Sequence, residues 1–226
     1  MKPSRPRATL RAALIIAAIV AAPAAFADEF GDALLAIQQR WAQAMYATPD
    51  AAERRAALDA ITQEAAALAA RYPERAEPHI WQGIALSTFA AERGGFAALR
   101  LAKRARTELE TALRIDPGAA AAHTTLGALY LRVPRPPLGF GDMQKASEHL
   151  RLALQENPTA IDANFFYGEY LFRTGDHEGA VRHLDQALAA PARPGRELAD
   201  EGRRREAEEL MRRVRKEMGE PPSASG

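Results

Sequence analysis

The sequence predicts an all-α fold, a right-handed α-solenoid of antiparallel helix pairs, and three observations carry this prediction. Apolar residues recur at three- and four-residue steps over most of the chain, which is the spacing of amphipathic helices. Small, large and turn-forming residues return at matching positions in three consecutive stretches, and a proline closes the pattern before each of them. The chain has no cysteine, so neither a disulfide framework nor a thiolate metal site competes with this interpretation.

Residues 1–27 are typical of a secretory signal peptide. Four basic residues open the stretch, an apolar run of eleven residues follows over 12–22, and Ala25–Ala27 provides an A-x-A cleavage motif. A helix that spans a bilayer needs about 20 apolar residues, so the run is too short for a membrane anchor, although an uncleaved anchor is the alternative. We expect cleavage between Ala27 and Asp28, which leaves the mature protein in the periplasm, or secreted beyond it, without stable membrane insertion.

Removal of this peptide changes the charge balance. The whole chain carries 30 basic and 29 acidic residues, and four of the basic ones lie in the predicted signal, so the mature chain has a net charge of −3 with His neutral. Nucleic-acid binding requires a clustered basic surface. We therefore do not expect nucleic acid as a partner.

Residues 28–75 predict a pair of helices. The apolar stripe of the first comprises Phe30, Leu34, Ile37, Trp41 and Met45, and that of the second comprises Leu58, Ile61, Ala65, Leu68 and Tyr72. Pro49 interrupts the pattern, Asp50 is placed to cap the second helix, and Pro73 ends it. We expect this pair to be a degenerate first repeat that closes the N-terminal end of the stack.

The clearest repeat unit covers 161–192. Gly168 and Ala180 have little or no side chain, so the backbones of two antiparallel helices can approach closely there. Gly175 and Asp176 form a turn signal between these helices. Apolar residues at helical spacing are Leu171, Leu184 and Leu188.

Two upstream stretches repeat the same anchors. Gaps of 44 and 41 residues separate both sets of anchors, which are Gly83, Gly127 and Gly168, and Pro73, Pro117 and Pro158. The gaps exceed a period of about 34 residues, and the excess lies between the two helices of a unit. We therefore expect an enlarged loop in a first unit over 76–119 and a proline-rich insertion at 133–140 in a second unit over 120–160. Both should project from one side of the stack, the looped edge.

Residues 196–219 predict a charged helix with a narrow apolar stripe, which suits a cap at the C-terminal end of the solenoid. Its run Arg203–Arg205 is interpreted as a solvated face with paired charges, and a docking patch is the alternative. Residues 220–226 predict a disordered tail.

The anchors over 76–190 resemble those of the tetratricopeptide repeat family. In that family the first helices of the units line a concave groove that binds proteins or peptides. The resemblance implies that the following residues face the groove: Glu77, Ile80, Ile84, Ser87, Thr88, Ala121, Thr124, Ala128, Leu131, Arg132, Asp162, Phe165, Glu169, Phe172 and Arg173.

Five of these residues, all toward the third unit, form the candidate partner site. They are Phe165, Phe172, Arg173, Arg132 and Glu169. Aromatic rings supply rigid contact area, and arginine can hold a carboxylate with two parallel hydrogen bonds. Plain core packing is the alternative for the phenylalanines. The lysine and asparagine set with which some family members clamp a terminal carboxylate is absent, so that specificity is not expected.

No catalytic, cofactor or metal-binding motif accompanies these residues. His79 and His123 share the repeat position at which the family packs an aromatic ring, and a hydrogen-bonded packing role is expected for both. The sequence thus predicts a non-enzymatic protein-binding scaffold that works through its groove and looped edge, without cofactors.

A second family suggests an alternative function. The signal peptide, the enlarged connections and the segment Gly139–Asp142 are similar to the periplasmic T component that accompanies some TRAP transporters. That resemblance implies an oligomeric ligand-handling accessory whose partner is a transporter or a solute-binding protein. The lipid-anchoring cysteine usual in those proteins is absent from this chain.

Overall fold

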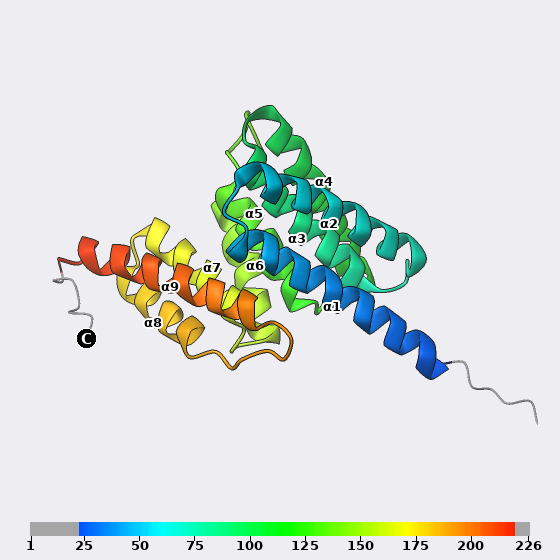
Figure 1. The fold of residues 1–226 in the computed structure, drawn as a ribbon. Helices are drawn as coiled ribbons and strands as arrows, with labels where there is room; N and C mark the ends of the chain where they lie inside the picture. The colour runs from blue at the N-terminus through cyan, green and yellow to red at the C-terminus, as the bar shows by residue number, and fades with distance from the viewer. Residues whose placement is uncertain (1–22, 220–226) are drawn as a thin grey trace, which may run out of the picture.

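The computed structural model describes residues 23–219, and every regular element in that range is an α-helix (Figure 1). The helices are α1 (Pro23–Ala47), α2 (Ala51–Arg71), α3 (Ala76–Arg93), α4 (Gly95–Ile115), α5 (Ala120–Arg132), α6 (Met143–Glu156), α7 (Ile161–Thr174), α8 (His177–Leu188) and α9 (Glu197–Glu217). None of these helices combines the length and the apolar composition that crossing a bilayer requires.

Two predictions fall at the ends of the chain. The predicted signal peptide lies outside the described residues except for 23–27, which belong to the start of α1, so the predicted cleavage point between Ala27 and Asp28 lies within that helix. The predicted disordered tail at 220–226 also lies outside the described residues.

The helices pack as antiparallel pairs, each against the next, and this confirms the predicted all-α solenoid (Figure 1). Asp50 caps α2 by accepting from the amides of Ala52 and Glu53, both at 2.8 Å. Gly175 ends α7 in the left-handed conformation with a φ of 87°, and Asp176 then caps α8. The turn predicted between the helices of the third unit is therefore present.

The enlarged loop predicted for the first unit is wrong. The additional residues lengthen both helices, so α3 has 18 residues and α4 has 21, and a single residue, Gly94, separates them. The residues added to this unit contain no proline. Helix formation can therefore continue from both sides up to Gly94 and Gly95, whose φ values are 67° and 62°. In the second unit three prolines prevent helix formation, and residues 133–142 form a loop.

The same glycine–leucine contact joins the two helices in each of the three repeat units. A Cβ atom added to Gly83, Gly127 or Gly168 would lie 2.6, 2.5 or 3.0 Å from the Cγ atom of Leu109, Leu150 or Leu184, respectively. All three leucines are fully buried. The recurring spacing of these glycines in the sequence therefore reflects a place where the leucine of the second helix rests on the backbone of the first.

We expect Gly127→Ala to lower the free energy of unfolding by about 1–3 kcal/mol, because the new methyl group displaces the buried Leu150 side chain. Chemical denaturation measures the change. Gly31→Ala is the matched control, since Gly31 is an exposed position within α1 with nothing within 4 Å of an added Cβ, and this change should be neutral or stabilising by up to about 1 kcal/mol. Equal effects of the two substitutions would contradict the packing argument.

A second contact also recurs in every unit, this time between polar side chains. The three bonds join His79 Nδ1 to Glu108 Oε2, His123 Nδ1 to His149 Nδ1, and His183 Nδ1 to Asn164 Oδ1, each at 2.9 Å. They occupy the position where the repeat family packs an aromatic ring. His79 and His123 thus have the hydrogen-bonded packing role that the sequence predicts.

The histidine pair of the second unit makes stability depend on pH. His123 Nε2 donates to the carbonyl oxygen of Pro117 at 3.0 Å, so its Nδ1 accepts from His149. Burial, and then the charge of His123, lower the pKa of His149 below its ordinary 6.5. The unfolded chain therefore binds more protons, and the stability contributed by His149 is present above pH 6.5 and is lost as the pH falls below it.

Denaturation titrations on both sides of pH 6.5 test this dependence. We expect His149→Gln to reduce the acid-side loss of stability, because the neutral amide removes a group whose pKa is lowered in the folded protein. A profile that His149→Gln does not change would assign the loss to other groups.

The first helices of the pairs form a closed ring. Each of α1, α3, α5 and α7 contacts the next, α7 contacts α9, and α9 returns to contact α1. At the closure Gln39 Nε2 donates to the carbonyl oxygen of Gly195 at 3.3 Å, and Arg196 Nη1 donates to Gln38 Oε1 at 3.2 Å. The predicted capping helix at 196–219 therefore covers α7 and α8 as expected and, in addition, joins the N-terminal helix.

Candidate functional site

The ring of first helices surrounds a pocket of about 1280 Å³. This volume exceeds the range of about 300–1,000 Å³ that is usual for small-molecule sites. Most of the residues that the tetratricopeptide resemblance assigns to the concave groove line this pocket; the exceptions are Glu77, Ile80 and Leu131. The structure thus brings the predicted groove positions of the three units together around one space.

The wall formed by α1 and α3 is apolar and aromatic. Trp41 and Trp81 meet edge to face with their ring centroids 6.0 Å apart, and the indole Nε1 of Trp41 donates to Thr88 Oγ1 at 3.1 Å. Both residues are buried, and both line the pocket. At the mouth, Phe96 and Leu138 are 91% and 72% exposed, and they come from the two segments that the sequence predicts as insertions.

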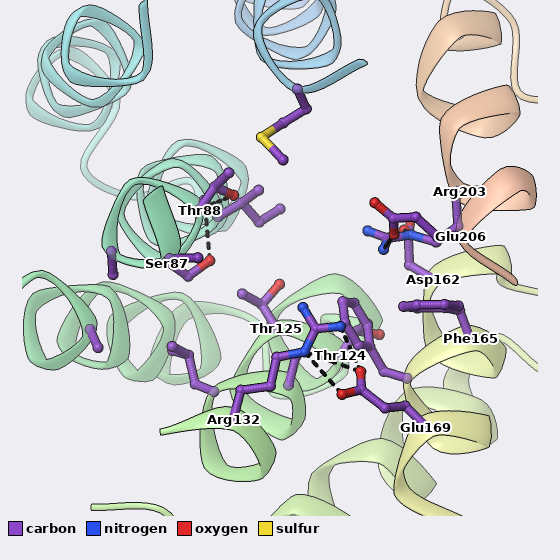
Figure 2. A pocket seen from close by; sticks show the side chains of 18 of the residues that line it. Ser87, Thr88, Thr124, Thr125, Arg132, Asp162, Phe165, Glu169, Arg203 and Glu206 are labelled. Atoms are coloured by element: carbon purple, nitrogen blue, oxygen red, sulfur yellow. Dashed lines mark hydrogen bonds and ion pairs between the residues drawn. The ribbon is translucent and has the colours of Figure 1, made fainter. Parts of the chain in front are cut away.

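The opposite wall carries charge, and Glu169 organises it (Figure 2). Arg132 holds this carboxylate with both Nε and Nη2, at 3.1 and 2.6 Å, and Arg173 holds its other oxygen at 2.6 Å. Burial alone would raise the pKa of Glu169, but the two guanidinium groups outweigh it and lower that pKa. Two arginines share one carboxylate, so this cluster leaves one positive charge on the pocket wall.

Three of the predicted partner residues are therefore already bound to one another. The side chain of Glu169 is only 10% exposed, whereas those of Arg132 and Arg173 are 47% and 44% exposed. Arg173 also donates to the carbonyl oxygen of Leu131 at 3.0 Å. The guanidinium forks expected to hold a partner's carboxylate face an internal one, and only their outer edges are accessible.

The two predicted phenylalanines differ from each other. Phe165 is 4% exposed, belongs to the core between α7 and α9, and has the Arg203 guanidinium 4.7 Å from its ring centroid. Phe172 is half-buried, and Arg213 lies 5.5 Å from its ring centroid. Of the two, Phe172 presents more surface to the pocket.

Arg203 is the buried cation of the site, with 8% of its surface exposed. It donates to Asp162 at 2.7 Å and pairs with Glu206, and Arg193 holds the other oxygen of Asp162 at 3.1 Å. Burial would raise the pKa of Asp162, but Arg203 and Arg193 outweigh it and lower that pKa. The interpretation of 203–205 as a solvated helix face is therefore wrong at its first residue, because that side of α9 faces α7 and α1.

Sequence reasoning missed the part of the pocket wall that α1 and α9 supply. The lining residues from these helices and from the turn before α9 include Trp41, Met45, Tyr46, Arg193, Arg196, Arg203, Glu206 and Arg213. One signal was available, since a glycine inside a charged helix, Gly202, often marks close packing. A Cβ atom at Gly202 would lie 2.4 Å from the ring of Tyr46.

Residues 23–219 contain no cluster of three His, Cys, Asp or Glu side chains arranged to hold a metal ion. What the described arrangement offers is binding surface, with an apolar aromatic wall facing a wall of arginines and carboxylates.

Comparisons with known proteins agree with this fold. Residues 138–194 match the family model of the tetratricopeptide repeat. TTC0263, described as a thermophilic TPR protein in Thermus thermophilus, has a crystal structure that aligns at 19% identity with a TM-score of 0.53, covering 68% of this chain and 74% of that one. At this identity the likeness shows the fold alone. A search of curated proteins found no match.

Two further solved structures align less closely. MamA is 16% identical over 74% of this chain and 92% of its own, with a TM-score of 0.43. PilF of Pseudomonas aeruginosa is 15% identical over 84% of this chain and 92% of its own, with a TM-score of 0.34. These scores are too low to support an argument about the site.

Proposed function

Because the chain is a tetratricopeptide repeat protein, we propose that it is a non-enzymatic scaffold that binds a segment of another protein in the pocket enclosed by its first helices. One observation carries the proposal: one pocket of about 1280 Å³ is lined by most of the groove positions, with residues from all three units. Its volume and its two walls of different chemistry suit a peptide segment that combines apolar and polar side chains.

We also propose that the protein works in the periplasm. The support is the N-terminal sequence, in which a basic start, an apolar run and Ala25–Ala27 follow one another as in secretory signal peptides. Fractionation of cells that express the full chain, followed by N-terminal sequencing, tests this proposal. A mature N-terminus at Asp28 supports it, and retention of the intact chain in the cytoplasm contradicts it.

A photo-reactive amino acid placed at Ala121 tests the binding proposal. Ala121 is an exposed residue of α5 that lines the pocket, so a bound segment should be cross-linked there in cells. Ala60, an exposed residue of α2 that is not among the pocket-lining residues, is the matched control position. We expect a protein adduct from position 121 and none from position 60.

The partner identified by this cross-link is then captured by affinity with protein that carries no cross-linker. Ala121→Trp should reduce its recovery by about tenfold or more, because an indole in the pocket takes the place of bound side chains and a loss of about 1.4 kcal/mol is already tenfold. Ala60→Trp makes the same change outside the pocket and should leave recovery unchanged. Both variants must keep the wild-type helicity by circular dichroism. Equal recovery of the partner with the two variants would show that the partner does not bind in the pocket.

The contact between α1 and α9 favours a second candidate function, an oligomeric accessory that handles a compact ligand for a transport system. It encloses the pocket on a side where an open solenoid would leave a groove. Native mass spectrometry of the mature protein distinguishes the two. A defined oligomer with a reproducible small-molecule adduct supports the accessory, whereas a monomer without adduct supports the scaffold.

A further inference from the structure

We infer that the segment bound in the pocket is acidic as well as apolar, and that one of its carboxylates binds at Arg196, between the aromatic wall and the N-terminal end of α9. The inference rests on the proposed function and adds the chemistry of the partner. Its basis is the distribution of charge around the pocket.

Arg196 is a pocket-lining cation without an ion pair among the described residues. Its Nη1 donates to the neutral amide of Gln38 at 3.2 Å, and its buried Nε has no hydrogen-bond partner within residues 23–219. Burial, and then the charge of Arg193, lower the pKa of Arg196, so the charged guanidinium is poorly compensated where it stands. An incoming carboxylate that binds the accessible edge of this half-buried guanidinium would supply the missing negative charge.

The position of Arg196 determines what must lie beside that carboxylate. Its guanidinium carbon lies 4.8 Å from the ring centroid of Trp81, whose indole belongs to the apolar wall with Trp41. An acidic side chain at Arg196 therefore has apolar neighbours in contact with the indoles. A segment that is uniformly acidic, or uniformly apolar, would leave one of the two surfaces without a partner.

The other charges of the pocket support an anionic partner and do not cancel Arg196. Arg132 and Arg173 share the single carboxylate of Glu169, and Arg213 lies against Phe172 without an ion pair in the described part of the chain. Arg193 and Arg203 pair with three acids, Asp162, Asp200 and Glu206, so this cluster has one negative charge in excess. The positive charges of Arg213 and of the cluster around Glu169 outweigh it. The uncompensated charge facing the pocket is therefore positive.

Selection from a random-sequence peptide library displayed on phage tests this inference with the mature protein. Peptides that bind wild type but not Ala121→Trp are retained as pocket binders. We expect them to be enriched in Asp or Glu next to apolar residues. One selected peptide is then synthesised in its acidic form and with each carboxylate replaced by the amide, and both forms are measured by fluorescence anisotropy.

We expect the amide peptide to bind wild type about tenfold to a hundredfold more weakly, since hydrogen bonds to charged groups contribute about 1.5–3 kcal/mol. Arg196→Gln should weaken binding of the acidic peptide by a similar factor, and its affinities for the acidic and the amide peptide should no longer differ. Arg213→Gln, at an exposed position, should weaken the acidic peptide to a smaller extent. Arg104→Gln removes the same charge from an exposed part of α4 that does not line the pocket and should have no effect.

Two outcomes would overturn the inference, and only the second would also contradict the proposed scaffold function. The first outcome is that the selected pocket binders are not enriched in acidic residues, or that Arg196→Gln binds the acidic and the amide peptide with the same affinities as wild type. In that case the inference fails and the scaffold function stands. If every selected binder also binds Ala121→Trp, or if none is selected, the proposed function fails with it.

Discussion

Replacement of Arg203 by alanine is expected to lower the free energy of unfolding by about 3–5 kcal/mol, the usual cost of removing one partner of a buried ion pair. Arg203 is 8% exposed and pairs with Asp162 and Glu206. Its guanidinium also lies against the rings of Phe165 and Phe166, at 4.7 and 4.8 Å from their centroids. The substitution therefore leaves Asp162 with one partner, Arg193, and opens a space between α7 and α9.

Chemical denaturation of two companion variants separates this explanation from a general effect of losing charge. Arg205→Ala breaks an exposed pair with Glu201, in which the side chains are 54% and 66% exposed, and should cost at most about 1 kcal/mol. Adding Asp162→Asn to Arg203→Ala removes the carboxylate that has lost one of its two arginine partners and should restore part of the stability. A similar loss of unfolding free energy in Arg203→Ala and Arg205→Ala would show that the buried ion pairs of Arg203 contribute no more than an exposed pair.

Gly202→Ala is expected to separate α9 from α1. In an isolated helix the change would be favourable by about 0.5–1 kcal/mol. Here the added methyl group would meet the ring of Tyr46 at 2.4 Å, and we expect a net loss of about 1–3 kcal/mol. The contact has a spectroscopic readout, because burial, partly opposed by Arg203, raises the pKa of Tyr46 to about 12.

Alkaline ultraviolet titration measures this readout. In the wild-type protein Tyr46 should ionise near pH 12, a step assigned by its loss in Tyr46→Phe, and Gly202→Ala should move the pKa of Tyr46 toward the ordinary 10.0. Since the pKa is raised in the folded state, this tyrosine stabilises the protein below pH 10 and its contribution is lost as the pH rises to about 12. An unchanged titration in Gly202→Ala would show that the helices remain together.

The repeat anchors were predictable because each has a local cause. The glycines at 83, 127 and 168 must be small for the leucine of the paired helix to pack, and such a requirement returns with the repeat. The groove positions came from the tetratricopeptide resemblance, which was applied in the register that these anchors set. The charged cluster was partly visible too, because Glu169 and Arg173 stand four residues apart on one helix.

The errors involve information that local sequence does not contain. Gly94 and Gly95 indicate a loop by composition, yet two residues in the left-handed region are enough to join two long helices. The arginine run of α9 indicates a solvated surface, and only the return of that helix to α1 places Arg203 inside. Contacts between residues as far apart as Gln38 and Arg196, separated by 158 positions, leave no periodic signal.

The closed ring also affects how the molecule unfolds. An open array of repeats behaves as a linear chain of coupled units, in which the terminal units fray first because each has one neighbour. In this protein α1 and α9 are neighbours of each other, so neither end of the array is free to fray in that way. The junction joins residues 158 positions apart, which places it among the contacts with the largest loop-closure entropy and makes it late to form in folding. This long-range contact thus couples the first and last elements into one cooperative unit.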